Sequence, residues 1–233
     1  MHPAALAAWQ RLQALAWPAV GGAALLYHPS PATTLATTAA LALTSHVSLV
    51  LLLRAHRLAD LCTAARVGML SAALWWASHA GGVTWPIWGA CVVAVLADLL
   101  DGAVARARGP TAHGAVLDME ADQLATLQLA VLAMVAWDVG PLALLLPGFR
   151  FAYVLLGWIR GLPAHDPKPK AGDNRRARAI CAGSMTLILA ALAPPLPGSA
   201  RVACVAIAAI ALAYSFADDF VYLLRRRRAQ TSP

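Results

Sequence analysis

The chain has few acidic residues and few charged residues of either sign. Asp and Glu together number 11 among 233 residues, and charged residues make up only 12% of the chain, whereas 60% of it is hydrophobic. An average soluble domain is about 25% charged, so this composition excludes an ordinary soluble domain. The mean hydropathy of +0.65 leads to the same conclusion. The sequence therefore predicts a membrane protein.

Cysteine is also scarce, and the positions of the cysteines exclude two classes of site. The chain has four of them, dispersed in apolar segments: Cys62, Cys91, Cys181 and Cys204. Their spacing matches neither a zinc site nor a disulfide framework. We therefore interpret them as small buried hydrophobic residues.

Apolar runs account for most of the chain. They cover residues 12–27, 33–53, 61–80, 86–107, 115–137, 141–159, 179–196 and 202–224. Most approach the length of about 20 residues that spans a bilayer. The first run is short and contains Pro18, Gly21 and Gly22, so we expect an interfacial or re-entrant segment there. No small-residue cleavage site follows it, and we expect this segment to be retained. The pattern predicts an all-α, polytopic membrane bundle.

Basic residues gather at alternate ends of these runs. They occur at 54–57, 106–108, 160–178 and 225–228, whereas the connections 81–85, 138–140 and 194–201 carry a single basic residue. By the positive-inside rule, the basic ends face the cytoplasm, and the protein is an integral inner-membrane protein. The net charge of +7 is explained in the same way. We therefore expect contact with membrane lipids and no binding to nucleic acid.

Five of the eleven acidic residues lie between Asp98 and Asp122. The order is Asp98-x2-Asp101-Gly102-x2-Ala105-Arg106-x7-Gly114-x3-Asp118-x3-Asp122. In each half of this pattern, the two aspartates share one helical face with a small residue. The Gly-Pro pair at 109–110 predicts a turn between the halves. Carboxylates at the edge of lipid are costly, so this cluster is a candidate site. Glu120 points to another face, and we interpret it as a surface residue.

This pattern resembles the signature of the CDP-alcohol phosphotransferase family, membrane enzymes of phospholipid synthesis: D-x2-D-G-x2-A-R-x8-G-x3-D-x3-D. Every named residue is present, although the gap between Arg106 and Gly114 is seven residues rather than eight. The last six apolar runs match the family's six-helix core. We expect an N-terminal extension with one or two membrane helices over residues 1–57, a catalytic membrane domain over 58–224 and a basic cytoplasmic tail over 225–233.

The resemblance implies a metal-dependent phosphatidyltransferase acting on CDP-diacylglycerol, with release of CMP. Four carboxylates without histidine or cysteine in register suit Mg²⁺ or Mn²⁺. The resemblance implies that Asp122 also serves as the general base. It further implies a site that faces the cytoplasm and a homodimer. The implied metal ligands are Asp98, Asp101, Asp118 and Asp122, and the implied nucleotide-binding residues are Asp98, Gly102, Ala105, Arg106 and Gly114.

Two arginines are candidates for binding an anionic acceptor. Arg150 lies inside an apolar run, and Arg160 lies at its basic end. The segment 58–66 is similar to the P-N-x-x-T-x-x-R segment of phosphatidylglycerophosphate synthases, with Thr63 and Arg66 matching. Glycerol 3-phosphate is the leading acceptor, and inositol phosphate, serine or another alcohol stays open.

Two alternatives to an active transferase stay open. One is a membrane cation or proton transporter, and the other is an inactive family member with a misplaced second aspartate pair.

Overall fold

A computed structural model of the chain describes residues 3–27, 29–55, 57–108, 112–137, 139–162 and 171–231. Within these ranges, the side chains of residues 3, 98–108, 112, 171–174 and 228–231 lie outside the description. The described residues form helices and no strand, which confirms the all-α prediction. The elements are α1 (Pro3–Tyr27), α2 (Pro31–Leu53), α3 (Leu58–Ala80), α4 (Trp85–Arg108), α5 (Ala112–Ala136), the short 3₁₀ helix η1 (Gly140–Leu144), α6 (Leu145–Ile159), α7 (Ala171–Leu192) and α8 (Gly198–Thr231).

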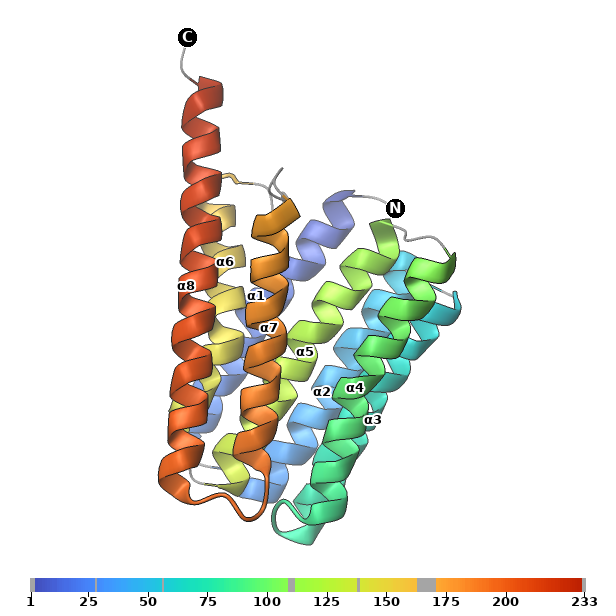
Figure 1. Ribbon diagram of the computed structural model, residues 1–233, viewed down its shortest axis with the longest axis vertical. Helices are drawn as coiled ribbons and strands as arrows, with labels where there is room; N and C mark the ends of the chain where they lie inside the picture. Colours follow the sequence, from blue (N-terminus) through green and yellow to red (C-terminus); the bar gives the residue numbers. More distant parts are fainter. Residues whose placement is uncertain are drawn as a thin grey trace.

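The described helices form one elongated bundle (Figure 1). Five helical segments are long and apolar enough to cross a membrane, so the chain is a multi-pass membrane protein: α2, α3, α5 from His113, the η1–α6 pair and most of α8. In Figure 1, α2, α3 and α4 lie to the right and α6, α7 and α8 to the left, with α5 between the two groups. The α2–α3 connection, the end of α6 and the end of α8 all lie at the upper end of this view. The basic ends of the helices are therefore gathered at one end of the bundle.

α5 is the central helix, and small residues let its neighbours come close. It contacts α2, α3, α6 and α7. Most of its enclosed apolar positions are leucine or alanine: Leu117, Ala121, Leu124, Ala125, Leu129, Ala130, Leu132 and Ala133. In a membrane, helices associate through such close van der Waals packing, since lipid supplies little hydrophobic driving force. The side chains of α5 are therefore held in fixed directions by the helices around it.

The start of α3 is fixed by an acidic cap. The Asp60 Oδ2 atom accepts a hydrogen bond of 3.0 Å from the backbone N–H of Arg57, and this carboxylate is buried. An acidic side chain in the first turn satisfies a backbone donor and favours the positive end of the helix dipole. Thr63, one turn on, donates its hydroxyl to the Ala59 carbonyl at 3.1 Å. These contacts set the position and rotation of α3, on which Arg66 projects inward.

The N-terminal segment forms a helix despite its proline and glycines. α1 is continuous with Pro18 inside it, so the chain does not break at Pro18, Gly21 or Gly22, and the interfacial or re-entrant placement of this segment stays a prediction. It packs along α6 and touches α2. The Arg11 guanidinium lies 5.0 Å from the ring centre of Trp158 on α6, and Trp9 donates to Ser48 on α2 at 2.9 Å. These tertiary contacts offset the poor helix propensity of proline and glycine.

A buried arginine closes the end of α7 opposite the basic end of the bundle. Arg201 is 3% exposed and donates to the carbonyls of Leu196 at 2.7 Å, Ala191 at 2.7 Å and Pro194 at 2.8 Å. Its guanidinium also lies 3.7 Å from the ring centre of Trp137. The last carbonyls of a helix have no partner within the helix and need an external donor. The one basic residue in the connection 194–201 is therefore a structural cap.

Replacement of this cap is expected to lower stability without changing the site. In Arg201→Met, the three carbonyls lose their donor, at a cost of about 1–3 kcal/mol for each unsatisfied group that stays dry. A net loss of about 3 kcal/mol lowers the unfolding midpoint of a chain this size by roughly 6–12 °C. Thermal unfolding in detergent measures the shift. Arg225→Met, at an exposed arginine of the basic end, is the control. Equal midpoints for the two variants would contradict the capping role.

Candidate active site

Two aspartates of α5 face the same direction near the basic end of the bundle. Asp118 and Asp122 are four residues apart, so their side chains lie one above the other on the helix surface. The Asp118 side chain is 51% exposed and the Asp122 side chain is 32% exposed. Gly114 lies one turn earlier and is partly exposed. The register predicted for the second half of the signature is therefore present on one face of α5.

A buried arginine of α3 bridges the two aspartates. Its Nη1 atom lies 2.9 Å from the Asp122 Oδ1 atom, and its Nη2 atom lies 3.4 Å from the Asp118 Oδ1 atom. The Arg66 side chain is only 2% exposed. A buried charge is costly unless it is paired, and the forked guanidinium can serve two carboxylates at once. Arg66 therefore fixes the direction of both side chains and reduces the repulsion between them.

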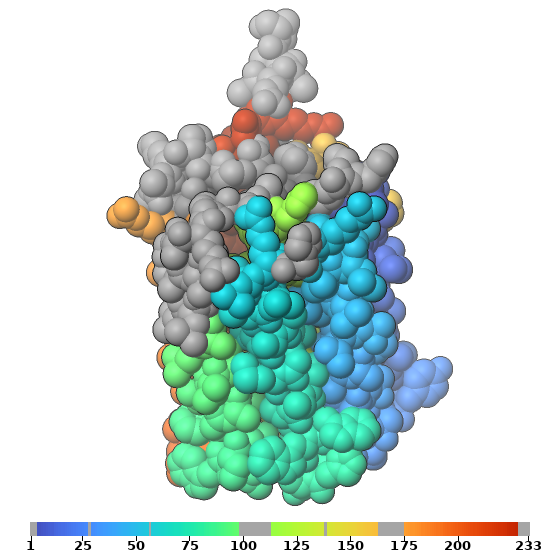
Figure 2. All heavy atoms as spheres, turned by 90° about the vertical axis from the view of Figure 1, so that its right-hand side faces the viewer, coloured from blue at the N-terminus to red at the C-terminus, as the bar shows by residue number. Residues whose placement is uncertain are grey.

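The first half of the signature lies on α4. In Figure 2, α3 occupies the middle of the face, between α2 and the described part of α4. α4 packs mainly on α3 and touches α5 at few positions. The predicted site residues of this half have side chains outside the described residues: Asp98, Asp101, Gly102, Ala105 and Arg106.

The described half of the site suits a hard metal ion. Asp118 and Asp122 offer carboxylate oxygens, the donors that Mg²⁺ and Mn²⁺ prefer, on one partly exposed face. Within the described residues, no group of three or more His, Cys, Asp or Glu side chains forms a metal site. Two carboxylates alone do not complete a metal site. The further predicted ligands, Asp98 and Asp101, lie on the part of α4 whose side chains are outside the described residues. The donors present fit the predicted metal.

A fully buried ion pair lies on another face of α5. The Glu120 Oε1 atom lies 3.1 Å from the Arg150 Nη2 atom, and both side chains are 8% exposed. The same Glu120 oxygen accepts a hydrogen bond of 2.7 Å from the Gln10 Nε2 atom of α1. The prediction that Glu120 is a surface residue is wrong, because α1 and α6 cover the face on which it lies. Three helices meet at this cluster.

This pair bears on the arginines considered for acceptor binding. Glu120 is two residues from both Asp118 and Asp122, so Arg150 lies on the side of α5 away from them. Its guanidinium is engaged by Glu120 and lies 6.0 Å from the ring centre of Tyr153. The structure does not bring Arg150 together with the aspartates. Arg160 is exposed at the end of α6.

Arg66 and Gln10 were not among the residues assigned to a site from the sequence. A signal for Arg66 was available, because it is a charge inside an apolar run and matches the T-x-x-R segment. Its partners follow only from the packing of α3 on α5. For Gln10 the sequence carries no signal, since one glutamine in an alanine-rich helix is ordinary. The bridging contact is therefore a finding of the structure.

A known protein family matches most of this sequence. A family model described as CDP-alcohol phosphatidyltransferase matches residues 56–217. A search of curated proteins and a search of solved structures each found no match. The matched span runs from the start of α3 into α8, and it leaves α1 and α2 outside. It covers well over half of the chain and includes Arg66, Asp118 and Asp122. The chain therefore belongs to the CDP-alcohol phosphatidyltransferase family.

Proposed function

We propose that this protein is a metal-dependent enzyme that moves the phosphatidyl group of CDP-diacylglycerol to a small alcohol and releases CMP. The family transfers phosphatidyl groups in phospholipid synthesis, uses a CDP-alcohol and an alcohol acceptor, and is generally dependent on a divalent metal. The observation that carries the proposal is the buried Arg66, which holds both aspartates of the second signature half in one direction. Such an arrangement is typical of a site that must keep carboxylates ready for a ligand.

Asp122 is the proposed general base. It takes the proton of the acceptor hydroxyl, whose oxygen then attacks the phosphorus next to the diacylglycerol. The phosphoanhydride bond breaks, and CMP leaves with the electron pair. Arg66 contributes by orientation: its contact with Oδ1 fixes the rotation of the carboxylate. A carboxylate in a fixed direction loses less entropy when it meets the acceptor.

Mg²⁺ or Mn²⁺ would neutralise the phosphate charge. The residues proposed to hold it are Asp98, Asp101, Asp118 and Asp122. The nucleotide-binding residues proposed beside them are Asp98, Gly102, Ala105, Arg106 and Gly114. Glycine and alanine leave the helix surface low enough for a nucleotide to approach, and an arginine suits a phosphate oxygen. The clustering of basic helix ends supports a site that faces the cytoplasm of an inner membrane. A homodimer is part of the proposal.

Glycerol 3-phosphate is the proposed acceptor. The T-x-x-R segment at Thr63 and Arg66 supports this choice, and Arg160, exposed at the end of α6, is the arginine proposed to bind the acceptor phosphate. Arg150 is not carried forward in this role, because it is buried against Glu120. Inositol phosphate, serine and other alcohols are distinguished from glycerol 3-phosphate by the experiment below.

Substitution of Arg66 is expected to slow the reaction more than it weakens donor binding. Arg66→Lys keeps the charge but loses the fork that reaches both aspartates, so turnover should fall by about 10-fold to 100-fold. Arg66→Gln loses the charge as well, so its turnover should fall further. Steady-state rates of CMP release measure the effect, with folding checked by thermal unfolding. Full activity in Arg66→Gln would show that the bridge has no part in the reaction.

The test of the function is CMP release by the purified chain with CDP-diacylglycerol, Mg²⁺ or Mn²⁺, and a panel of acceptors. The panel contains glycerol 3-phosphate, inositol phosphate, serine and a control without acceptor. Metal-dependent release with one acceptor, lost in Asp98→Ala, is the expected result and identifies the acceptor. Binding of CDP-diacylglycerol without release from any acceptor would contradict the acceptor set. Absence of both binding and release would contradict the enzyme and favour the inactive member or the transporter.

A further inference from the structure

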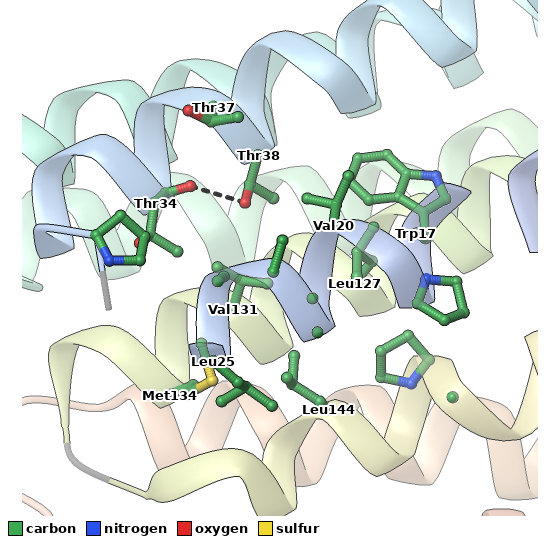
Figure 3. A pocket seen from close by; sticks show the side chains of 18 of the residues that line it. Trp17, Val20, Leu25, Thr34, Thr37, Thr38, Leu127, Val131, Met134 and Leu144 are labelled. Atoms are coloured by element: carbon green, nitrogen blue, oxygen red, sulfur yellow. Dashed lines mark hydrogen bonds between the residues drawn. The ribbon is translucent and has the colours of Figure 1, made fainter. Parts of the chain in front are cut away.

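A large apolar cavity lies between the N-terminal helices and the rest of the bundle. Its volume is about 520 Å³, and it is lined by α1, α2, α5, η1 and α6 (Figure 3). Ligand sites in proteins commonly have volumes of about 300–1,000 Å³, so the cavity is large enough for part of an organic molecule. Trp17, Leu127, Val131 and Phe151 are buried wall residues, whereas Leu25 is 44% exposed at the rim.

The cavity is on the other side of α5 from the aspartates. Leu127 and Val131 follow Glu120 by seven and eleven residues, which places all three on one helical face. That face is covered by α1 and α6 and is turned away from Asp118 and Asp122. Two of the cavity's walls, α1 and α2, also lie outside the span matched by the family model. The cavity is therefore separate from the proposed reaction site.

Three polar groups in the wall are already used in hydrogen bonds with neighbouring turns of the chain. Thr38 donates its hydroxyl to the Thr34 carbonyl at 2.8 Å, and Thr34 donates to the Ser30 carbonyl at 3.1 Å. Figure 3 draws the first of these bonds beside the cavity. The indole N–H of Trp17 donates to Gln13 on its own helix at 2.8 Å. These residues therefore present mainly carbon to the cavity, which favours a hydrocarbon ligand.

Three glycines help to keep the cavity open. A Cβ atom added at Gly21, Gly22 or Gly148 would meet no atom within 4 Å. A cavity of this kind in water would be dry and costly, but in a bilayer the surrounding solvent is itself hydrocarbon. The exposed Tyr27 marks the end of α1, at the end of the bundle away from the basic residues, where an interfacial aromatic belongs. A lipid with its head group near Tyr27 can reach the buried wall with its chain.

We propose that this cavity binds one acyl chain of a bilayer phospholipid from the leaflet opposite the aspartates. The chain enters sideways past Leu25, lies against Leu127 and Val131, and fills the space between α1 and α6. The bound lipid is a structural ligand and takes no part in phosphatidyl transfer. This inference is independent of the proposed function, because it requires neither nucleotide nor turnover.

The test uses phosphatidylglycerol with a photoactivatable diazirine at the end of one acyl chain, added to the chain in nanodiscs. After irradiation, mass spectrometry of peptides locates the label. We expect label on Leu127, Val131 or Phe151, which are 5%, 6% and 7% exposed and out of reach of lipid outside the bundle. Label confined to outward-facing residues such as Leu26 and Ile210, which are 78% and 71% exposed, would overturn the proposal.

Cavity-filling variants supply the matched control. Gly148→Leu should reduce label at the wall residues by about fivefold or more, because its side chain occupies the space of the acyl chain. Gly183→Leu makes the same change on α7, where an added Cβ also meets no atom within 4 Å but no cavity is filled. If Gly148→Leu does not fold, Gly22→Leu fills the cavity from α1. Label unchanged by the folded cavity-filling variant would refute the site.

A competition arm identifies the source of the chain. Unlabelled CDP-diacylglycerol and unlabelled phosphatidylglycerol at equal amounts should displace the label equally, since only the chain is recognised. Stronger displacement by CDP-diacylglycerol would contradict the proposal and make the cavity part of the donor site. Because labelling is measured without metal or acceptor, loss of enzymatic activity cannot be confused with loss of this site.

Discussion

Turnover by Asp122→Asn is expected to fall by at least about a thousandfold, while CDP-diacylglycerol binding stays largely intact. Asparagine has the size of aspartate and keeps an oxygen that can accept a hydrogen bond from Arg66. It cannot take the proton of the acceptor hydroxyl, so the chemical step is lost, whereas its amide oxygen can still serve as an oxygen ligand of the metal. Rates of CMP release at saturating substrate, together with calorimetric titration of the donor, measure the two quantities separately.

Asp219→Asn on α8 is the control for this experiment, since it removes one carboxylate outside the site. Its rate should stay close to that of the unchanged chain. Robust turnover in Asp122→Asn would remove Asp122 as the base. Loss of both turnover and donor binding would instead assign Asp122 to binding alone, and the general base would have to be sought elsewhere.

Breaking the buried pair of Glu120 and Arg150 is expected to lower the stability of the protein. Glu120→Gln or Arg150→Met leaves one charge buried without its partner, and breaking such a pair costs about 3–5 kcal/mol. For a chain of this length, the unfolding midpoint should fall by roughly 6–20 °C. The double variant should recover most of this loss, because neither charge is left in the bundle. Thermal unfolding of the four forms in detergent gives the coupling energy directly.

Arg176→Met provides the matched control for that cycle. Arg176 pairs with Asp218 across α7 and α8, but these side chains are 42% and 39% exposed. An exposed pair contributes about 0–1 kcal/mol, so this variant should change the midpoint little. Independent, additive effects of Glu120→Gln and Arg150→Met would contradict a coupled buried pair.

Hydropathy and helical register predicted the helices of this protein and the face that Asp118 and Asp122 share. The six apolar runs of the core correspond to helices α3 to α8, because length and apolarity dominate the choice of structure in a bilayer. The four-residue spacing of Asp118 and Asp122 put them on one face before any packing was known. Both results depend on local sequence alone, which is why they could be predicted.

Tertiary packing decided the features that the sequence did not reveal. Helical phase correctly placed Glu120 away from the aspartates, but only the position of α1 and α6 makes that face an interior one. Pro18 lowers helix propensity, yet contacts with α6 and α2 keep α1 continuous. The bridge from Arg66 to two aspartates of α5 joins residues more than 50 positions apart. Such pairings depend on which helices are neighbours, and a single sequence does not contain that information.

The most direct test of the central claim follows the phosphatidyl group itself. The chain in nanodiscs receives CDP-diacylglycerol with isotopically labelled acyl chains, divalent metal and the preferred acceptor, and mass spectrometry measures the lipid product alongside CMP. We predict one labelled phosphatidyl-alcohol for each CMP, and neither product from Asp122→Asn. CMP formed with labelled phosphatidic acid and no phosphatidyl-alcohol would contradict the account, because the phosphatidyl group would then have passed to water rather than to an alcohol.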